Sequence, residues 1–372
     1  MDKFKLAAPC LMGVERLLSN ELKFMGAENV KADNGRVFFE GGPDIIARAN
    51  LCSRIAERIL VVCGSFSARS FEELFNGVRK IQWSEYIPFG AAFPVTGSCL
   101  SSQLKSVSDC QGIIKKAAAE SLKEAFGVSG MLPEGESVYK IRFLILKDTA
   151  HIMLDTTGEP LHKRGYRANA NDAPMKETLA AAIVELSGAR KASLIIDPCC
   201  GSGTIVIEAA QKALNIAPGI NRSFVSENMK LVPASVWESE RIAAKSMIKT
   251  SVNFHAVGYD IDESALRIAQ ENAYKAGVGD YVSFEKRDLH DFSESADSAV
   301  IICNPPYGER LLDVTQAEEL YKVMGERFVK KDGFSYNIIC PDDDFEKCFR
   351  RRADKRRKLY NGMISCQLYQ YH

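Results

Sequence analysis

Several features are scarce in this sequence of 372 residues, and each scarcity excludes a class of protein. No apolar stretch is long enough to span a bilayer, and the apolar start Leu6–Met12 passes into Glu15 within a few residues, unlike a signal peptide. The formal net charge is zero, so a nucleic-acid contact requires a local basic patch. The five histidines are scattered, so we predict no metal site.

Cysteine is not scarce, and its spacing is informative. None of the eleven cysteines forms a Cys-x-x-Cys pair, and several lie in apparent core strands. This pattern predicts reduced thiols in the cytoplasm rather than disulfides. A chain of this length has room for two or three domains.

The stretch Ser193–Thr204 predicts a ligand site. A short apolar run, Leu194–Ile196, precedes an acid and a proline, as in a buried parallel strand. A turn containing Gly201 and Gly203 follows, where the missing side chains let the backbone approach a ligand. An apolar helix begins directly after the turn. This order places a site at the carboxyl end of the first strand of an open α/β sheet.

The identity of the ligand follows partly from what this turn lacks. It has neither Gly-x-Gly-x-x-Gly nor Gly-Lys-Ser/Thr, so both phosphate-binding patterns are missing. Asp197 precedes the glycines, and a carboxylate suits an ammonium rather than a phosphate. S-adenosylmethionine carries an ammonium, a sulfonium and no phosphate. An ordinary strand-to-helix turn would account for the glycines taken alone.

Two further acids end predicted strands. The strand His255–Asp260 ends at Asp260, which we expect to bind ribose hydroxyls. The alternating strand Tyr281–Asp288 ends at Asp288, which suits the adenine amino group. A single aspartate at such a position is more often a cap or a turn residue. Three acids at successive strand ends favour a cofactor site.

A fourth strand, Ala299–Cys303, runs into Asn304-Pro305-Pro306-Tyr307. The prolines fix the backbone, so that carbonyl groups can point into a cleft. The Asn304 side-chain oxygen and the Pro305 carbonyl can both accept hydrogen bonds from the amino group of a base. Tyr307 offers a flat face on which an extruded base can stack.

Four stretches together resemble one known family: Asp197–Thr204 (Asp-Pro-Cys-Cys-Gly-Ser-Gly-Thr), Asn304–Leu311 (Asn-Pro-Pro-Tyr-Gly-Glu-Arg-Leu), Leu161–Arg167 and Ala173–Ala181. Over essentially its whole length the chain resembles the THUMP-domain RNA methyltransferases, especially the bacterial type that makes N2-methylguanine in 23S ribosomal RNA. The resemblance implies an α/β, Rossmann-like class I methyltransferase domain preceded by an α+β ferredoxin-like and THUMP region. It also implies S-adenosylmethionine as the cofactor.

The resemblance and the motifs together assign domains and site residues. The expected domains are a ferredoxin-like piece (1–44), a THUMP RNA-binding domain (45–155), a linker (156–172) and the methyltransferase domain (173–372). The predicted catalytic residues are Asn304, Pro305, Pro306 and Tyr307. The predicted cofactor-binding residues are Asp197, Cys199, Gly201, Gly203, Thr204, Asp260, Asp288 and, by resemblance, Pro174.

Two basic stretches are candidates for RNA contact. The run Arg350–Lys358 holds seven positive residues and one negative residue, and the joint His162–Arg167 combines cations with Tyr166. A solvated loop and an interdomain salt-bridge hinge are the respective alternatives. The predicted RNA-binding residues are Lys163, Arg164, Arg167, Arg310, Arg351, Arg352, Arg356 and Arg357.

Other segments give structural expectations. Asn34-Gly35 predicts a hairpin, and Ser106–Phe126 predicts a long helix that is ended by Gly127. The segment Gln211–Asn253 is an insertion between the first helix and the second strand of the methyltransferase domain, and we expect it to cap the cleft.

The expected activity is methylation of the exocyclic N2 of a guanine, with 23S ribosomal RNA as the favoured partner and transfer RNA as the second. The residues alone do not separate guanine N2 from adenine N6, because both are aromatic amines that need the same acceptors. An adenine-N6 methyltransferase acting on DNA or RNA and an RNA-binding assembly factor without activity are the remaining alternatives. The oligomeric state stays open.

Overall fold

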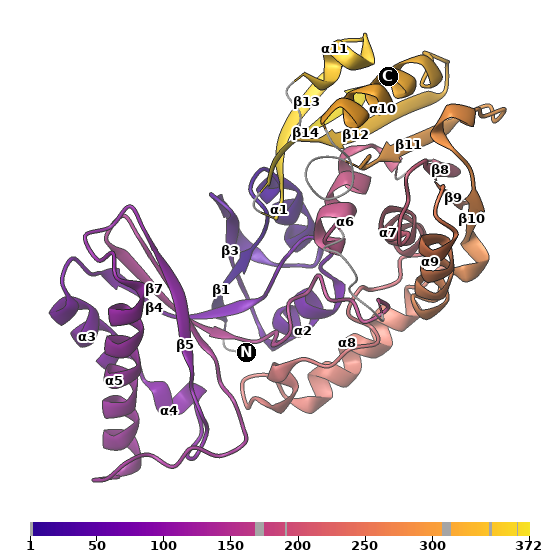
Figure 1. Cartoon of the computed structure of the whole chain (residues 1–372). Coiled ribbons are helices and arrows are strands. Elements are labelled where there is room, and N and C mark those ends of the chain that lie inside the picture. The colour runs from indigo at the N-terminus through magenta and orange to yellow at the C-terminus, as the bar shows by residue number, and fades with distance from the viewer. Residues whose placement is uncertain (1–2, 168–174, 190–191, 307–313, 342–343, 363) are drawn as a thin grey trace.

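The computed structural model describes residues 3–167, 175–189, 192–306, 314–341, 344–362 and 364–372. Two seven-stranded sheets dominate it, one in each half of the chain. They form two lobes, and the amino-terminal lobe lies to the left in Figure 1.

The amino-terminal sheet has the strand order β2-β3-β1-β4-β7-β6-β5, and all its pairs are antiparallel except β5 with β6. Its strands are β1 (Phe4–Pro9), β2 (Glu28–Asp33), β3 (Arg36–Gly41), β4 (Leu60–Ser67), β5 (Val95–Leu100), β6 (Ile141–Leu146) and β7 (Thr149–Asp155). Its helices are α1 (Glu15–Phe24), α2 (Pro43–Cys52), α3 (Phe71–Arg79), α4 (Trp83–Tyr86) and α5 (Val107–Phe126). The pairing of β1 with β4 joins the first two predicted domains in one continuous sheet.

Local sequence signals explain several of these elements. Gly35 has a φ of 70° in the turn between β2 and β3, which confirms the predicted hairpin. The Ser106 side chain caps α5 by accepting a hydrogen bond from the amide of Asp109, and Gly127 ends this helix in the left-handed region with a φ of 66°. The predicted long helix is therefore confirmed.

The carboxyl-terminal sheet has the order β10-β9-β8-β11-β12-β14-β13. Its strands are β8 (Leu194–Asp197), β9 (His255–Asp260), β10 (Val282–Lys286), β11 (Ala299–Cys303), β12 (Phe334–Cys340), β13 (Lys355–Asn361) and β14 (Ile364–Tyr371). Its helices are α6 (Glu177–Leu186), α7 (Thr204–Ala213), α8 (Ala234–Ser246), α9 (Glu263–Lys275), α10 (Val314–Arg327) and α11 (Phe345–Phe349), with 3₁₀ turns η2 (Val225–Asn228), η3 (Gly279–Tyr281) and η4 (Leu289–Asp291).

The strands from β10 to β12 are parallel, and β14 and β13 are antiparallel to their neighbours. The strand order reverses between β8 and β11, which makes their carboxyl ends a topological switch point. The predicted Rossmann-like α/β fold is confirmed, and ligands of such sheets bind at this point.

The expected place of the insertion is wrong. Its helix α8 packs against α2 of the amino-terminal lobe, where Arg48 donates to both carboxylate oxygens of Glu240 at 2.8 and 2.6 Å. Gly219 also donates to the carbonyl of Leu51 at 2.8 Å. The insertion therefore joins the lobes, because its polar and apolar partners lie on the amino-terminal one.

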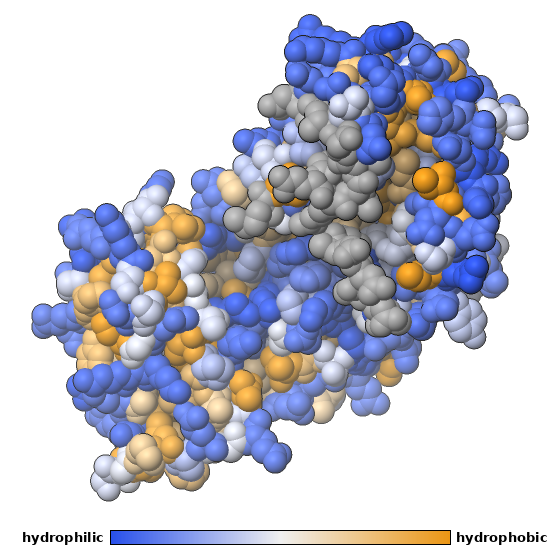
Figure 2. Space-filling model, in the orientation of Figure 1, coloured by the Kyte–Doolittle hydropathy of each residue, from blue (hydrophilic) through white to orange (hydrophobic). Residues whose placement is uncertain are grey.

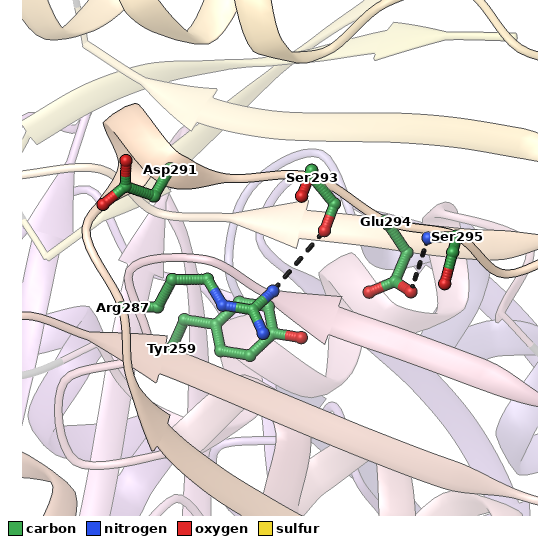
Figure 3. Close-up of a pocket in the computed structure, with 6 residues that line it drawn as sticks. All are labelled: Tyr259, Arg287, Asp291, Ser293, Glu294 and Ser295. Atoms are coloured by element: carbon green, nitrogen blue, oxygen red, sulfur yellow. Dashed lines mark hydrogen bonds between the residues drawn. The ribbon is translucent and has the colours of Figure 1, made fainter.

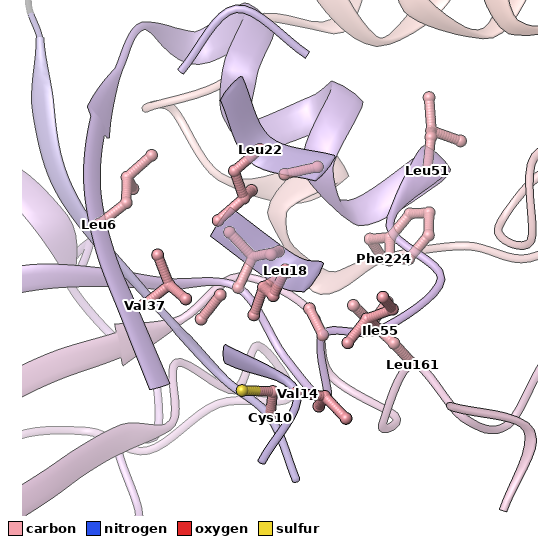
Figure 4. Close-up of a cluster of buried hydrophobic side chains, with 14 of the residues drawn as sticks. Leu6, Cys10, Val14, Leu18, Leu22, Val37, Leu51, Ile55, Leu161 and Phe224 are labelled. Carbon is pink, nitrogen blue, oxygen red and sulfur yellow. The ribbon is translucent and has the colours of Figure 1, made fainter. Parts of the chain in front are cut away.

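One hydrophobic core runs through both lobes. Leu18, Leu51 and Ile55 from the amino-terminal lobe lie in the same buried cluster as Leu161 and Phe224 (Figure 4). Removing such apolar area from water stabilises the contact by about 25 cal/mol per Å². The lobes therefore share a packed interface rather than a bare linker.

The surface in Figure 2 is mostly hydrophilic, and its apolar side chains are scattered among polar ones. Of the helices that the structure describes, none combines the length and the apolar character needed to cross a bilayer. Within the same residues, no cluster of three or more histidine, cysteine, aspartate or glutamate side chains is arranged to hold a metal ion.

Candidate active site

The glycine turn between β8 and α7 is tied to the neighbouring strand β9. The amide of Cys200 donates to the carbonyl of Tyr259 at 2.8 Å, and the amide of Gly201 donates to Oδ2 of Asp260 at 2.8 Å. These bonds fix the turn at the carboxyl end of the sheet. The structure thus brings together the first two of the three predicted acidic strand ends.

The two glycines of the turn have different surroundings, although both lie in the left-handed region, with φ of 50° at Gly201 and 80° at Gly203. A Cβ atom on Gly201 would meet nothing within 4 Å, whereas one on Gly203 would lie 2.9 Å from the ring of Phe284 and 3.1 Å from the Cβ of Ala269. Gly201 therefore leaves open space for a ligand, and Gly203 allows close packing of the turn on the sheet.

Asp197 at the end of β8 is a buried carboxyl group with a relative exposure of 1%. Its Oδ1 accepts a hydrogen bond from the amide of Cys199 at 3.1 Å. Burial raises the pKa of Asp197 to about 8, and the nearby charge of Asp260 adds to this effect. A cationic ligand beside Asp197 would offset the cost of ionising it.

Asp260 ends β9, whereas β10 ends at Lys286, two residues before the predicted end at Asp288. Oδ1 of Asp260 accepts from the amide of Asp262 at 3.0 Å, and the register pairs Asp260 with Lys286, two residues before Asp288. The Asp288 side chain is half exposed and accepts from the amide and the Nδ1 atom of His290, at 2.9 and 2.7 Å. These hydrogen bonds lower the pKa of Asp288, so that it is an anion at neutral pH.

Asn304 follows β11, which pairs with β8 through Ile301 and Ile196. Its side-chain oxygen Oδ1 is buried and has no hydrogen-bond partner among the described residues. A buried acceptor without a partner costs about 1–3 kcal/mol, and a ligand that supplied a donor would remove this cost. Pro305 is buried and Pro306 is half-buried beside it.

The thiols near this site are not poised as nucleophiles. Burial raises the pKa of Cys200 far above its ordinary value, and burial together with a hydrogen bond from the Cys303 thiol to Cys199 does the same for Cys303. The eleven cysteines all lie in the described part of the chain, and none is in a disulfide.

Arg167 supports the glycine turn from the linker, a role that the sequence analysis missed. Its Nη2 atom donates to Oγ1 of the buried Thr204 at 2.6 Å, and its Nε atom lies 3.6 Å from a carboxylate oxygen of Glu177. The Arg167 side chain is only 13% exposed. The structure therefore uses this arginine inside the protein, where the sequence analysis expected a phosphate contact.

The prediction that Arg164 contacts RNA is wrong. Its side chain is 1% exposed and forms an ion pair with Glu208 of α7 at 3.4 Å, and the Tyr166 hydroxyl donates to the same carboxylate at 3.2 Å. Arg164 also donates to the carbonyl of Arg54 at 2.6 Å, which ties the linker to the amino-terminal lobe. Lys163, in contrast, is exposed and pairs with a surface glutamate, so its RNA contact stays a prediction.

The basic run Arg350–Lys358 leads into β13, an edge strand of the sheet. Arg352 is exposed, Arg357 is half-buried, and Arg356 forms an ion pair with Glu346. Arg351 stacks on aromatic rings. Cations on an edge strand also discourage pairing with other sheets. The predicted roles of Pro174, Tyr307 and Arg310 lie outside the described residues.

A separate cavity of about 590 Å³ lies on another side of β9 (Figure 3). The Arg287 guanidinium lies 3.9 Å from the centroid of the Tyr259 ring, which belongs to the buried aromatic cluster on that face. Neighbouring residues of a strand face opposite sides of a sheet, so Tyr259 and Asp260 point apart. None of the predicted site residues lines this cavity, and no sequence signal marked it.

Fold and strand-end groups together define a Rossmann-like, S-adenosylmethionine-dependent methyltransferase. Residues 164–370 match the family model described as RMKL-like, methyltransferase domain, residues 5–60 match the RlmL ferredoxin-like domain, and residues 68–155 match the THUMP domain. The chain belongs to the RMKL-like methyltransferase family.

Named relatives agree with this membership. The chain is 43% identical, over its whole length and 96% of the relative, to the Bacillus subtilis (strain 168) protein called "Putative RNA methyltransferase YpsC". It is 34% identical over 98% of its length to "Ribosomal RNA large subunit methyltransferase K/L" of Psychromonas ingrahamii, and it spans 49% of that protein.

A solved structure agrees with the cofactor. The solved structure of SMU.472, described as "a putative methyltransferase complexed with SAH", superposes with a TM-score of 0.93 at 42% identity, covering 100% of this chain and 98% of that one. SAH is S-adenosylmethionine without its methyl group. The predicted family, the methyltransferase activity and the cofactor S-adenosylmethionine are therefore confirmed.

Proposed function

We propose that this chain methylates the exocyclic N2 amine of a guanine in RNA, and that its substrate is large-subunit (23S) ribosomal RNA. The THUMP match and the name of the K/L relatives support this substrate. The chain spans about half of the length of those relatives. The reaction would take place in the cytoplasm, where thiols stay reduced.

The residues present fit S-adenosylmethionine, which supplies an activated methyl group when bound. In the proposal, the open space above Gly201 admits the cofactor, and Asp197 faces its ammonium. Asp260 would bind the ribose hydroxyls, and Asp288 the adenine amino group. Both carboxylates keep oxygen lone pairs beyond the hydrogen bonds that hold them in place.

The observation that carries the proposal is the unpartnered Oδ1 atom of Asn304. In the proposal it accepts an N–H of the target amine and holds the nitrogen lone pair toward the methyl group. The Pro305 carbonyl is the expected second acceptor. Since an exocyclic amine is already a nucleophile, orientation supplies most of the rate, and no residue has to form a covalent bond.

The test is nucleoside analysis by mass spectrometry of ribosomal and transfer RNA from a strain without the protein. We expect N2-methylguanosine to decrease in large-subunit RNA, to return with the wild-type gene and to stay low with the Asn304→Ala gene. Loss from transfer RNA instead would move the substrate, and loss of N6-methyladenosine would replace the target base. Unchanged nucleosides in both pools would contradict the proposal.

A further inference from the structure

A basic site lies at the amino ends of the parallel strands of the carboxyl-terminal sheet, on the side away from Asn304. Because β12 runs parallel to β11, the first residues of β12 lie at the amino ends of the strands, opposite the carboxyl ends that bind the cofactor. The register pairs Tyr336 of β12 with Tyr371 of β14 at this edge. A cavity of about 210 Å³ opens here, and its cationic lining residues are Lys330, Lys331, Arg351 and Arg352. We call it the basic cavity.

Arg351 is held inside the basic cavity by aromatic rings. The carbon of its guanidinium lies 4.6 Å from the ring centroid of Tyr371 and 5.6 Å from that of Tyr336. Its Nε and Nη2 atoms are buried without a hydrogen-bond partner among the described residues, and no carboxylate there lies within ion-pair distance. The positive charge is therefore held in place without an ion-pair partner among the described residues, an arrangement that favours an anion.

The other cations keep the basic cavity positive. Lys330 and Arg352 are exposed, and Lys331 donates to the carbonyl of Ala296 at 2.7 Å. The acidic side chain in the lining, that of Asp354, accepts a hydrogen bond from the amide of His372 at 2.7 Å. The basic run of the sequence is thus divided, because Arg351 and Arg352 line the cavity and Lys355 to Lys358 do not.

We propose that the basic cavity binds a phosphate of the RNA backbone. This proposal rests on the proposed RNA substrate and extends it, because the lining residue Phe334 lies four positions of β12 before Ile338, the register partner of Cys303, a separation of roughly 13 Å at 3.3 Å per residue. The RNA would therefore run around the edge of the sheet. Guanidinium and ammonium groups are the side chains that bind phosphate oxygens.

The test compares two double charge reversals of equal size, one inside the lining of the basic cavity and one outside it. The cavity variant carries Lys330→Glu and Arg352→Glu, and the matched control carries Lys355→Glu and Lys358→Glu, which are exposed residues outside the lining. Binding of a 40-nucleotide RNA is followed by fluorescence anisotropy between 50 and 200 mM salt.

We expect the cavity variant to bind RNA at least about tenfold more weakly, with a salt slope reduced by about 1, as for one lost phosphate contact. The control should change by less than about threefold. The melting temperature and the S-adenosylmethionine affinity of both variants should equal those of wild type, which verifies that both are folded. Equal weakening in both variants, or none in either, would overturn the proposal.

A second arm separates RNA from a free anion. Inorganic phosphate at 10 mM should leave RNA binding at constant ionic strength within about twofold of its starting value. Phosphate binding by the wild type but not by the cavity variant, measured by calorimetry, together with the same RNA affinity in both proteins, would assign the cavity to a free anion and overturn the RNA assignment. Because this is an equilibrium measurement, its outcome is independent of whether the enzyme methylates the RNA.

Discussion

Asp197 and Asp260, the two aspartates beside the glycine turn, differ in how deeply they are buried. Asp197 is buried with one amide donor, and its pKa rises to about 8 from 3.8, whereas Asp260 accepts two amide hydrogen bonds nearer the surface. Between about pH 4 and about pH 8 the folded protein holds a proton at Asp197 that the unfolded chain has lost. Its contribution to stability is complete below about pH 4 and is lost as the pH rises through about 8.

Asp197→Asn should therefore stabilise the cofactor-free protein as the pH increases. Each held proton changes the free energy of unfolding by at most about 1.4 kcal/mol per pH unit, and asparagine removes that dependence. We expect the melting temperature of the variant, relative to wild type, to rise from pH 5.5 to pH 8.5. A difference that is constant with pH would contradict the buried, protonated state.

The glycines of the turn give a matched pair. Alanine at either position costs about 1–2 kcal/mol for the left-handed backbone. Gly201→Ala points into open space, so we expect a loss of S-adenosylmethionine affinity of about tenfold or more, measured by calorimetry. Gly203→Ala presses on Phe284, so we expect a larger fall in melting temperature. Reversed behaviour of the two variants would contradict the assignment of the cleft.

At the scale of elements, the linker is a structural joint. Arg164 is buried between the carbonyl of Arg54 in one lobe and the carboxylate of Glu208 on α7 in the other. Sequence reasoning could not distinguish Arg164 from Lys163, since both are cations in a segment without periodicity. The partners that decide the matter are 110 and 44 residues away from Arg164.

Lys163→Met and Arg164→Met should separate RNA binding from stability. Breaking a buried ion pair costs about 3–5 kcal/mol, so Arg164→Met should melt roughly 6 °C or more below wild type. RNA affinity per folded molecule should fall for Lys163→Met and stay unchanged for Arg164→Met. Thermal melting and fluorescence anisotropy measure the two effects. A stable Arg164→Met protein with weakened RNA binding would reverse our correction.

The elements of the catalytic half were predictable where their signals are local. Apolar runs that are followed by aspartates, glycines or prolines marked β8, β9, β10 and β11 in the sequence. The parallel arrangement then places the carboxyl ends of these strands side by side. The position of α8 was not predictable in this way. Glu240 meets Arg48 across 192 residues of sequence, and nothing in the local pattern of either residue points to the other.

At the scale of the whole molecule, the two lobes depend on each other. Leu161 and Phe224 complete a hydrophobic cluster whose other members include Leu18 and Ile55 of the amino-terminal lobe. The predicted division at residue 156 separates these side chains, although the THUMP match ends at residue 155. A domain boundary in sequence is therefore not a boundary in packing here.

A fragment of residues 156–372 should fold poorly by itself. Its cluster residues Leu161 and Phe224 would be exposed to water, and Arg164 would lose the carbonyl groups of Ser53 and Arg54 that accept its hydrogen bonds. We expect stronger binding of a hydrophobic dye and a lower, broader melting transition than for the full chain. A fragment with full-chain stability and cofactor affinity would show that the lobes are independent.

The proposed catalysis depends on the side-chain oxygen of Asn304, which follows β11, and one measurement tests this role directly. Single-turnover methyl transfer is followed for wild type and Asn304→Ala on large-subunit RNA from the deletion strain, while calorimetry records S-adenosylmethionine binding by both. We predict a rate at least about a hundredfold lower for Asn304→Ala, with cofactor affinity within about threefold of wild type. Transfer at the wild-type rate by the variant would contradict the account.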